Sequence, residues 1–426
     1  MRRPLPAIYV AAVICFAAGF CSGNDSPTSI YQESLEIVWQ TVNENHYDST
    51  FGGLDFEAIR NRYRSLVSGV DTDEGFIELA NKMLQELKLS HYAVFNKEKA
   101  SSQSPLFSEG SIGLDVRLLN NEAVVTSVKA GFPAAEAGIR TGYTIVSIDG
   151  EPVDRIVADA WAKQLPYFNE RRQLGKVNEE VISRFYGEPE TSVTLAYLDE
   201  HDRRCEKTLS RMKRPNRTEI TEELPPFVVE FESAKLKGDI GYISFNTFMP
   251  PVDERFSAAL DTMMDVRGLI IDIRGNPGGS HVVGEAIASR LLQERTLFSV
   301  FRTREGSDEV YVEPEGRTYA GPIVILIDVL NRSASERFSG CMQSIGRATI
   351  IGERSSGSVG PSDALKLPNG STLMYLIAQS LTPDGTVLEG HGVIPDITVA
   401  LDKKALLDGV DSQLERAVEF IDESYN

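Results

Sequence analysis

The sequence predicts a multidomain α/β protein, and three observations carry that prediction. The chain has 426 residues, which is too long for one compact domain and suits about two or three domains of ordinary size. Hydrophobic residues make up 42% and charged residues 25%, as in globular proteins, so buried cores are feasible. The apolar pattern changes from helical to strand-like along the chain and then alternates between the two. We therefore expect three domains, each with its own dominant pattern.

The first domain is expected to be helical and to cover residues 27–103. Its apolar residues recur at intervals of three and four, as on one face of a helix, and the pattern stops at Leu89-Ser90-His91-Tyr92. The residues that set this pattern are Leu35, Val38, Trp39, Val42, Phe76, Leu79, Met83, Leu84 and Leu87.

The middle domain, residues 105–213, is expected to be β-rich with a helical insertion. Asp149-Gly150 lies between β-forming residues and is a strong hairpin signal. A polar helical pattern over about 157–185 interrupts the strands. The expected strands cover residues 111–118, 122–128, 143–148 and 192–197.

The last domain, residues 214–426, alternates strand and helix signals. Such alternation indicates a largely parallel sheet with helices on its faces. The expected strands cover residues 241–244, 268–273, 323–327 and 348–352, and the expected helices cover 256–264, 282–292 and 335–345.

The composition excludes several classes of function. The chain has 43 Lys and Arg against 62 Asp and Glu, a formal net charge of -19, so a nucleic acid partner is not expected. With 5 His and 4 Cys, neither a zinc site of several ligands nor a dense disulfide framework is expected. We see no nucleotide-binding motif, and we expect neither a cofactor nor a metal. Cys205 and Cys341 are expected to be buried free thiols, and a disulfide between them is the alternative.

Residues 1–23 have the pattern of an export signal. Arg2 and Arg3 precede an apolar run, residues 7–20, that is too short to span a bilayer comfortably. We therefore expect a periplasmic or extracellular protein. A lipid anchor at Cys21 is the less favoured alternative, because Phe20 stands where a lipoprotein signal needs a small residue.

Ser333 is the first candidate for chemistry. It follows a buried strand, residues 323–327, and precedes a helix, so it lies at the positive end of a helix dipole near outward-pointing N–H groups. That position suits a nucleophile beside an oxyanion hole. The alternative is structural, because Ser333 and Glu336 have the spacing of a helix capping box.

A glycine-rich turn after the strand at 268–273 is the second candidate. Gly278 and Gly279 permit unusual φ angles and a close approach of backbone N–H groups to a negative oxygen. The structural alternative is an ordinary tight loop, and Asp272 and Arg274 are expected to hold it.

Both segments belong to a longer series of motifs. In order these are Asp272-Ile273-Arg274-Gly275-Asn276-Pro277-Gly278-Gly279, Ser333-Ala334-Ser335-Glu336, Gly346-Arg347-Ala348, Ile351-Gly352-Glu353, Leu367-Pro368-Asn369-Gly370, Thr382-Pro383-Asp384-Gly385 and Gly392-Val393-Ile394-Pro395-Asp396. In this series the chain resembles the C-terminal processing peptidases, also called tail-specific proteases. The resemblance implies a PDZ-like domain, carried by residues 131–139 and 146–150, and a catalytic domain of ClpP/crotonase-like fold.

The resemblance implies a serine endopeptidase in which Ser333 is the nucleophile and the N–H groups of Gly279 and Ala334 form the oxyanion hole. One position departs from the bacterial enzymes, because Ser358 stands where they carry a lysine base. The tricorn-like branch of the family uses a His base with a Ser and a Glu instead. Ser90, His91 and Glu389 resemble those residues and complete a tetrad with Ser333.

A neutral His can accept the Ser proton near pH 7. The peptidase activity of an enzyme with such a base should fall below about pH 6 to 7, where the His becomes protonated. His391 is a rival base because it follows Glu389 closely, and Lys366 is a candidate for a displaced lysine. The remaining His residues, 46, 201 and 281, are interpreted as structural or surface residues. An inactive peptide-binding scaffold is the alternative from another functional class.

Partners are expected to be protein or peptide substrates that are unfolded or recognised at the C-terminus. In the PDZ-like domain, Gly110-Ser111-Ile112-Gly113 resembles the turn that captures a peptide carboxylate on backbone N–H groups while the peptide adds as a strand. A spacer without peptide affinity is the alternative. The sequence is compatible with a homo-oligomer, and it does not indicate a particular substrate.

Overall fold

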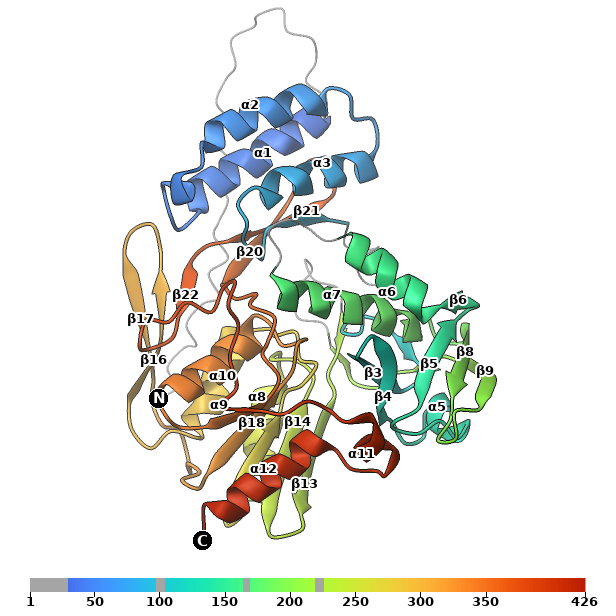
Figure 1. Cartoon of the computed structure of the whole chain (residues 1–426). Helices are drawn as coiled ribbons and strands as arrows, with labels where there is room; N and C mark the ends of the chain where they lie inside the picture. The colour runs from blue at the N-terminus through green and yellow to red at the C-terminus, as the bar shows by residue number, and fades with distance from the viewer. Residues whose placement is uncertain (1–29, 97–103, 164–168, 219–225, 426) are drawn as a thin grey trace, which may run out of the picture.

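The computed structural model describes residues 30–96, 104–163, 169–218 and 226–425. The expected export signal, residues 1–23, and Cys21 lie outside the described residues. The described chain forms a helical part, a β-rich part and a larger α/β part, so the multidomain α/β prediction is confirmed (Figure 1).

The helical part packs three helices around buried Phe76, Met83 and Leu84. A small sheet in the order β1-β21-β20 closes this core, so Leu367, Leu373 and Leu376 of the distant C-terminal region belong to it. The apolar core of the first domain is therefore completed by β20 and β21 of the last domain. The elements are α1 (Ile30–Asn45), α2 (Phe56–Val67), α3 (Asp73–Gln85), β1 (Ala93–Phe95), β20 (Ser362–Lys366) and β21 (Thr372–Leu376).

The middle part is a twisted antiparallel sheet in the order β3-β4-β5-β8-β9, with short β6 paired to β5. Asp149 and Gly150 both have positive φ, 50° and 80°, and join β5 to β6 as the hairpin signal predicts. The helical insertion is two helices, α6 (Val153–Ala162) and α7 (Glu170–Ile182). The strands are β2 (Gly110–Ser111), β3 (Leu114–Leu119), β4 (Glu122–Val128), β5 (Thr144–Ile148), β6 (Glu151–Pro152), β7 (Tyr186–Gly187), β8 (Ser192–Leu198), β9 (Arg204–Ser210) and β10 (Met212–Lys213).

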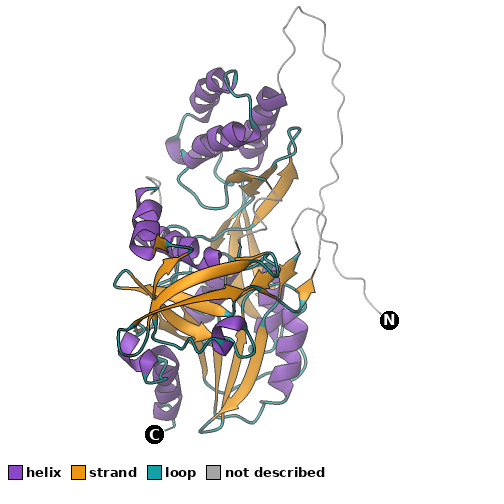
Figure 2. Ribbon diagram, turned by 90° about the vertical axis from the view of Figure 1, so that its right-hand side faces the viewer, coloured by secondary structure: helices purple, strands orange, loops and turns teal. Residues whose placement is uncertain are grey.

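The α/β part is built on a sheet in the order β13-β14-β15-β18-β19-β23, parallel from β14 onward. One face of this sheet packs against α8, α9 and α10, and the other face packs against α12. Figure 2 shows helices on both sides of the strands. The strands are β13 (Phe231–Leu236), β14 (Ile240–Phe245), β15 (Gly268–Asp272), β18 (Ile323–Ile327), β19 (Thr349–Gly352) and β23 (Ile397–Thr398). The helices are α8 (Val252–Asp261), α9 (His281–Ser289), α10 (Ala334–Ser344), α11 (Lys403–Leu407) and α12 (Ser412–Glu423).

Further strands flank this sheet. They are β11 (Arg217–Thr218), β12 (Phe227–Val228), β16 (Thr296–Arg302), β17 (Ser307–Val312) and β22 (Gln379–Leu381). All five residues of β15 and of β18 are buried, because helices cover both faces of the parallel sheet. Both strands end at the edge that carries the glycine-rich turn and Ser333. Among the described helices, none is long and apolar enough to cross a membrane.

Candidate active site

Ser333 lies at the sharp turn between β18 and α10. Its φ of 57° and ψ of -125° are outside the ordinary regions for a residue with a side chain, so the backbone is strained there. The Ser333 N–H donates to the Ser358 carbonyl at 2.6 Å, which fixes this turn. Its side chain makes no cap hydrogen bond to α10, so the capping-box interpretation is wrong. Among the described residues, no hydrogen bond engages the Ser333 hydroxyl.

Glu336 turns into the core instead of capping the helix. It is fully buried, and its carboxylate accepts hydrogen bonds from the Ser355 hydroxyl, from Gly357 N–H at 2.6 Å and from Ser358 N–H at 2.8 Å. Burial raises the pKa of Glu336 to about 7, although the three donors favour its charged form. Glu336 therefore anchors the segment that in turn binds Ser333.

Ser90, His91 and Glu389 form one hydrogen-bonded chain. The Ser90 hydroxyl donates to Glu389 Oε2 at 2.7 Å and lies 2.6 Å from His91 Nδ1. A carboxylate only accepts, so the hydroxyl hydrogen points to Glu389 and the hydroxyl oxygen accepts from Nδ1–H. His91 Nε2 then keeps its lone pair, which is the state that a general base requires.

Glu389 is held from three directions. Its Oε1 accepts from Ser90 N–H at 2.7 Å and from Arg172 at 2.8 Å, and its Oε2 accepts from Val359 N–H at 2.7 Å. The Ser358–Val359 peptide group thus accepts from Ser333 with its carbonyl and donates to Glu389 with its N–H. This shared peptide group joins the turn at Ser333 to the Glu389 carboxylate.

The imidazole of His91 is half-buried in this arrangement. The pKa of His91 is lowered to about 4, mainly because the ring is removed from water; the negative charge of Glu389 opposes this shift, and the positive charges of Arg332 and Arg172 add to it. The ring is therefore neutral at pH 7. A neutral ring can accept a proton.

The glycine-rich turn lies against Ser333. A Cβ on Gly278 would come within 2.8 Å of Ala334 N and of the Ser333 Cβ, so the two loops are in contact. Gly279 has a φ of 144° and forms an isolated bridge with Phe248. Within the described part of the chain, neither Gly279 N–H nor Ala334 N–H donates a hydrogen bond. Both are therefore available to a negative oxygen.

The rival bases lie elsewhere. His391 is exposed, and its Nδ1 lies 3.1 Å from the Glu389 backbone carbonyl, not from the carboxylate. Lys366 is exposed at the end of β20. The side chain of Ser358 is buried, 3.1 Å from the Ser356 hydroxyl. No hydrogen bond between described residues joins Lys366, His391 or His91 to the Ser333 hydroxyl; what distinguishes His91 is its link through Ser90 to the Glu389 carboxylate.

His46 proves to be structural. It is buried, its Nδ1 lies 2.7 Å from the Tyr92 hydroxyl, and burial lowers its pKa to about 4. It therefore anchors the residue that follows His91. His201 and His281 are exposed, and Cys205 and Cys341 are free thiols.

Sequence reasoning missed Arg172, the partner of Glu389. It lies in a polar helix among many charged residues, and no motif marks it. A fold-dependent contact between residues 172 and 389 leaves no local sequence signal.

In the turn predicted to bind a peptide carboxylate, the N–H groups already have partners. Ile112 N–H donates to the Phe185 carbonyl at 3.4 Å, and Gly113 N–H donates to the Ser111 hydroxyl at 2.9 Å. Gly110 and Ser111 form β2, which pairs with both β10 and β7. Carboxylate capture at this turn stays a prediction, and it would require these bonds to open.

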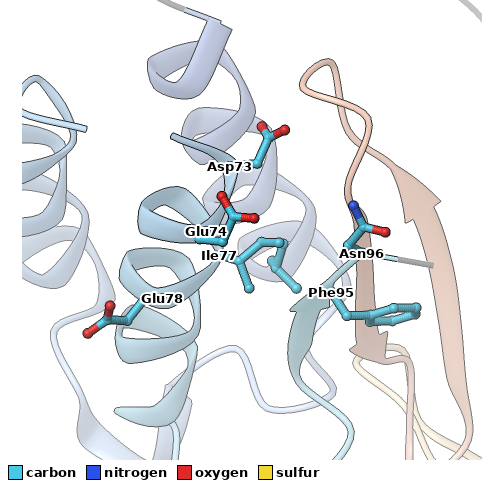
Figure 3. Close-up of a pocket in the computed structure, with 7 residues that line it drawn as sticks. Asp73, Glu74, Ile77, Glu78, Phe95 and Asn96 are labelled. Atoms are coloured by element: carbon cyan, nitrogen blue, oxygen red, sulfur yellow. The ribbon is translucent and has the colours of Figure 1, made fainter. Parts of the chain in front are cut away.

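A hollow of about 480 Å³ lies between α3 and β1 (Figure 3). Its lining residues are Asp73, Glu74, Ile77, Glu78, Val94, Phe95 and Asn96, none of which belongs to the predicted tetrad. Among the described residues, no group of three or more His, Cys, Asp or Glu is arranged to hold a metal ion.

Comparison with known proteins matches the three parts separately. Residues 239–399 match Peptidase family S41, residues 27–85 match the Tricorn protease C1 domain and residues 110–161 match a PDZ domain. The chain is 27% identical over 380 residues to the carboxy-terminal-processing protease of Bartonella bacilliformis, covering 86% of this chain and 79% of that protein. It is 25% identical over 408 residues to the carboxy-terminal processing protease CtpB of Bacillus subtilis, covering 94% and 78%.

Two solved structures share the fold. The photosystem II D1 C-terminal processing protease is 22% identical with a TM-score of 0.57, covering 89% of this chain and 97% of that one. The tricorn protease is 22% identical with a TM-score of 0.53, covering 93% of this chain and 37% of that one.

The fold and the family matches define a serine-type peptidase. The chain belongs to the C-terminal processing peptidases of family S41 that carry a PDZ domain.

Proposed function

We propose that this peptidase is a Ser-His-Ser-Glu endopeptidase that cleaves unfolded or C-terminally recognised proteins through an acyl-enzyme. The observation that carries the proposal is the hydrogen-bonded chain from Glu389 through the Ser90 hydroxyl to His91 Nδ1. With Glu389 as a carboxylate, this chain favours the tautomer with its proton on Nδ1 and its lone pair on Nε2. Ser358, at the position of the family lysine, has no basic group, so the base must come from elsewhere.

In this mechanism Ser333 Oγ attacks the substrate carbonyl carbon while its proton passes to His91 Nε2. The developing oxyanion accepts from the N–H groups of Gly279 and Ala334. The C–N bond then breaks, and His91 returns the proton to the leaving amine. Water then attacks the acyl carbon while its proton passes to His91 Nε2, and the ester C–O bond breaks as His91 returns that proton to Ser333 Oγ. Glu389, acting through the Ser90 hydroxyl, orients the imidazole and stabilises the imidazolium that forms.

The test compares wild type with Ser333→Ala on a reduced, unfolded protein substrate and with a fluorophosphonate probe. Wild type should cleave the substrate, and Ser333 Oγ should displace fluoride from the probe and gain the mass of its phosphonyl group; Ser333→Ala should do neither. If folded wild type neither cleaves nor reacts with the probe, an inactive scaffold is the better description and the proposal fails.

We also propose that the chain is exported. The support is the charged start with Arg2 and Arg3 and the apolar run over residues 7–20. Amino-terminal sequencing of the protein from its native host should find a mature chain that begins after about residue 23. An intact Met1 on cytosolic protein would contradict export, and a lipid-modified Cys21 would replace secretion with anchoring.

A further inference from the structure

Helix α7 lies between the segments that match known families. The PDZ match ends at residue 161 and the peptidase match begins at residue 239, whereas α7 covers Glu170–Ile182. In Figure 1 the helix runs from the β-rich domain toward the catalytic domain. The helix contacts both domains through polar side chains.

On the side of the PDZ-like domain, α7 covers β3, which is the end strand of its sheet. Two N–H groups of β3 donate outside the sheet, Val116 to Asp115 Oδ1 at 3.0 Å and Leu118 to Asn178 Oδ1 of α7 at 2.9 Å. The Val116 carbonyl accepts from Arg117 at 2.8 Å. Backbone groups that an added strand would need are therefore already bonded to side chains.

The apolar side of α7 strengthens this attachment. Val177, Val181 and Ile182 are buried in the same core as Val116 of β3. Gln173 Nε2 of α7 donates to the Ala160 carbonyl of α6 at 2.9 Å. The helix is thus an integral part of the PDZ-like domain.

On the catalytic side, Arg172 of α7 forms a buried ion pair with Glu389, with Nη2 2.8 Å from Oε1 and side chains 5% and 7% exposed. The same guanidinium donates to the Gly357 carbonyl. Asn169, just before α7, donates to the Gly390 carbonyl at 2.7 Å. The helix therefore binds both loops that flank the catalytic carboxylate.

The α7 helix also contacts the segment before the nucleophile. Glu179 forms an ion pair with Arg332, the residue next to Ser333. A Cβ on Gly175 would lie 3.1 Å from the Val329 carbonyl, so the helix packs closely on the strand-to-helix connection. The catalytic loops thus share one supporting element.

We propose that helix α7 occupies the strand edge of the PDZ-like domain in place of a peptide and that Arg172, presented from this helix, is a positioning residue for Glu389. The inference rests on the proposed tetrad. If the inference is correct, the PDZ-like domain holds Glu389 in place through Arg172. A peptide could then add to β3 only if α7 moved away from this strand.

Electrostatics distinguishes positioning from general structural support. The charged groups that face His91 are Glu389, Arg172 and Arg332, and Arg332 is paired with Glu179. Removing the positive charge of residue 172 leaves Glu389 uncompensated beside the imidazole. The pKa of His91 should then rise, so the acidic limb of the activity profile should move to higher pH.

The first experiment measures kcat/KM from about pH 4 to 9 for wild type, Arg172→Gln, Arg172→Lys and Glu180→Gln, with a thermal melt at each pH. Glu180 is exposed on the same helix, so Glu180→Gln is the matched charge-removing control. Arg172→Gln should lower kcat by about 10- to 100-fold and move the acidic limb upward. Arg172→Lys should keep the limb in place, and Glu180→Gln should match wild type.

A folded Arg172→Gln with the kcat and acidic limb of wild type would overturn the positioning role. A lower kcat with an unmoved limb would also overturn it, because support of the fold alone has that effect. If wild type itself never cleaves, the proposed function fails, and the second experiment still tests the position of α7.

The second experiment follows hydrogen exchange of Ser333→Ala with and without a heptapeptide that ends in valine with a free carboxylate. Unchanged exchange over 114–119 supports an edge closed by α7. Added protection there together with faster exchange over 170–182 supports competition between peptide and helix. Added protection over 114–119 while 170–182 stays protected would show strand addition beside a seated helix and would overturn the inference.

Discussion

Ser333 and Glu389 share one peptide group, because the Ser358 carbonyl accepts from Ser333 N–H and the adjoining Val359 N–H donates to Glu389 Oε2. The distances are 2.6 Å and 2.7 Å. The Ser358–Val359 peptide group therefore fixes the position of the Ser333 backbone relative to the Glu389 carboxylate.

Ser90→Ala should weaken catalysis without unfolding the chain. The substitution removes the hydroxyl that joins His91 Nδ1 to Glu389 and leaves the imidazole without its orienting partner. We expect kcat/KM to fall by about 100-fold, less than for loss of the base itself. Steady-state kinetics with Ser90→Thr as the matched control should show partial recovery. Full activity of Ser90→Ala would exclude the relay.

The acidic limb of the kcat/KM profile of wild type should lie well below pH 6 to 7, the range expected for an exposed His base. Burial lowers the pKa of His91 to about 4, and a base is active when unprotonated, so activity should persist as the pH falls toward that value. A kcat/KM profile corrected for the folded fraction checks this expectation. An acidic limb near pH 6.5 that is unchanged in Arg172→Gln would contradict a His91 base whose pKa is lowered by its surroundings.

Gly279→Ala should impair both folding and catalysis. Gly279 has a φ of 144°, and an added Cβ would lie 2.6 Å from the Phe248 carbonyl oxygen. We expect a loss of about 2 kcal/mol or more in the free energy of unfolding and about 100-fold or more in kcat. Gly306 is the matched control, because its φ is 152° and no atom lies within 4 Å of the added Cβ. Equal kcat for Gly279→Ala and Gly306→Ala would argue against the oxyanion hole.

Glu336 should make stability depend on pH. Burial raises its pKa from 4.5 to about 7, so the folded chain binds the proton more tightly than the unfolded chain. This stabilisation is complete below about pH 4.5 and is lost as the pH rises through about 7.

Glu336→Gln cannot titrate and is the reference. Between about pH 5 and 8 the free energy of unfolding of wild type should fall relative to Glu336→Gln, by on the order of 3 kcal/mol in total. Denaturant titrations at several pH values measure the difference. A difference that does not change with pH would show that the carboxyl of Glu336 does not titrate in this range.

The sequence predicted the elements with strong local signals. The buried run 323–327 is β18 and the Asp149-Gly150 hairpin is present, because apolar patterning and turn residues act locally. The capping-box interpretation of Ser333 and Glu336 failed, because spacing alone does not show that Glu336 is needed by the loop at 355–358. Contacts between distant segments therefore determine that Glu336 binds the loop at 355–358 and does not cap α10.

For the site, family resemblance was more informative than composition or periodicity. Nothing in the sequence near Ser90 and His91 indicates that Glu389, 299 residues beyond Ser90, accepts two of its hydrogen bonds. The roles of Arg172 and Asn178 were out of reach for the same reason, since a polar helix shows neither which domain it supports nor which strand edge it covers.

The most direct test of the tetrad compares kcat/KM of wild type, His91→Ala and Lys366→Ala on the same unfolded substrate near pH 7.5. His91→Ala should lose about 1000-fold or more, because Ser333 has no other base, and the exposed Lys366 should be replaceable without effect. Wild-type activity in folded His91→Ala, or its loss in Lys366→Ala, would contradict the account.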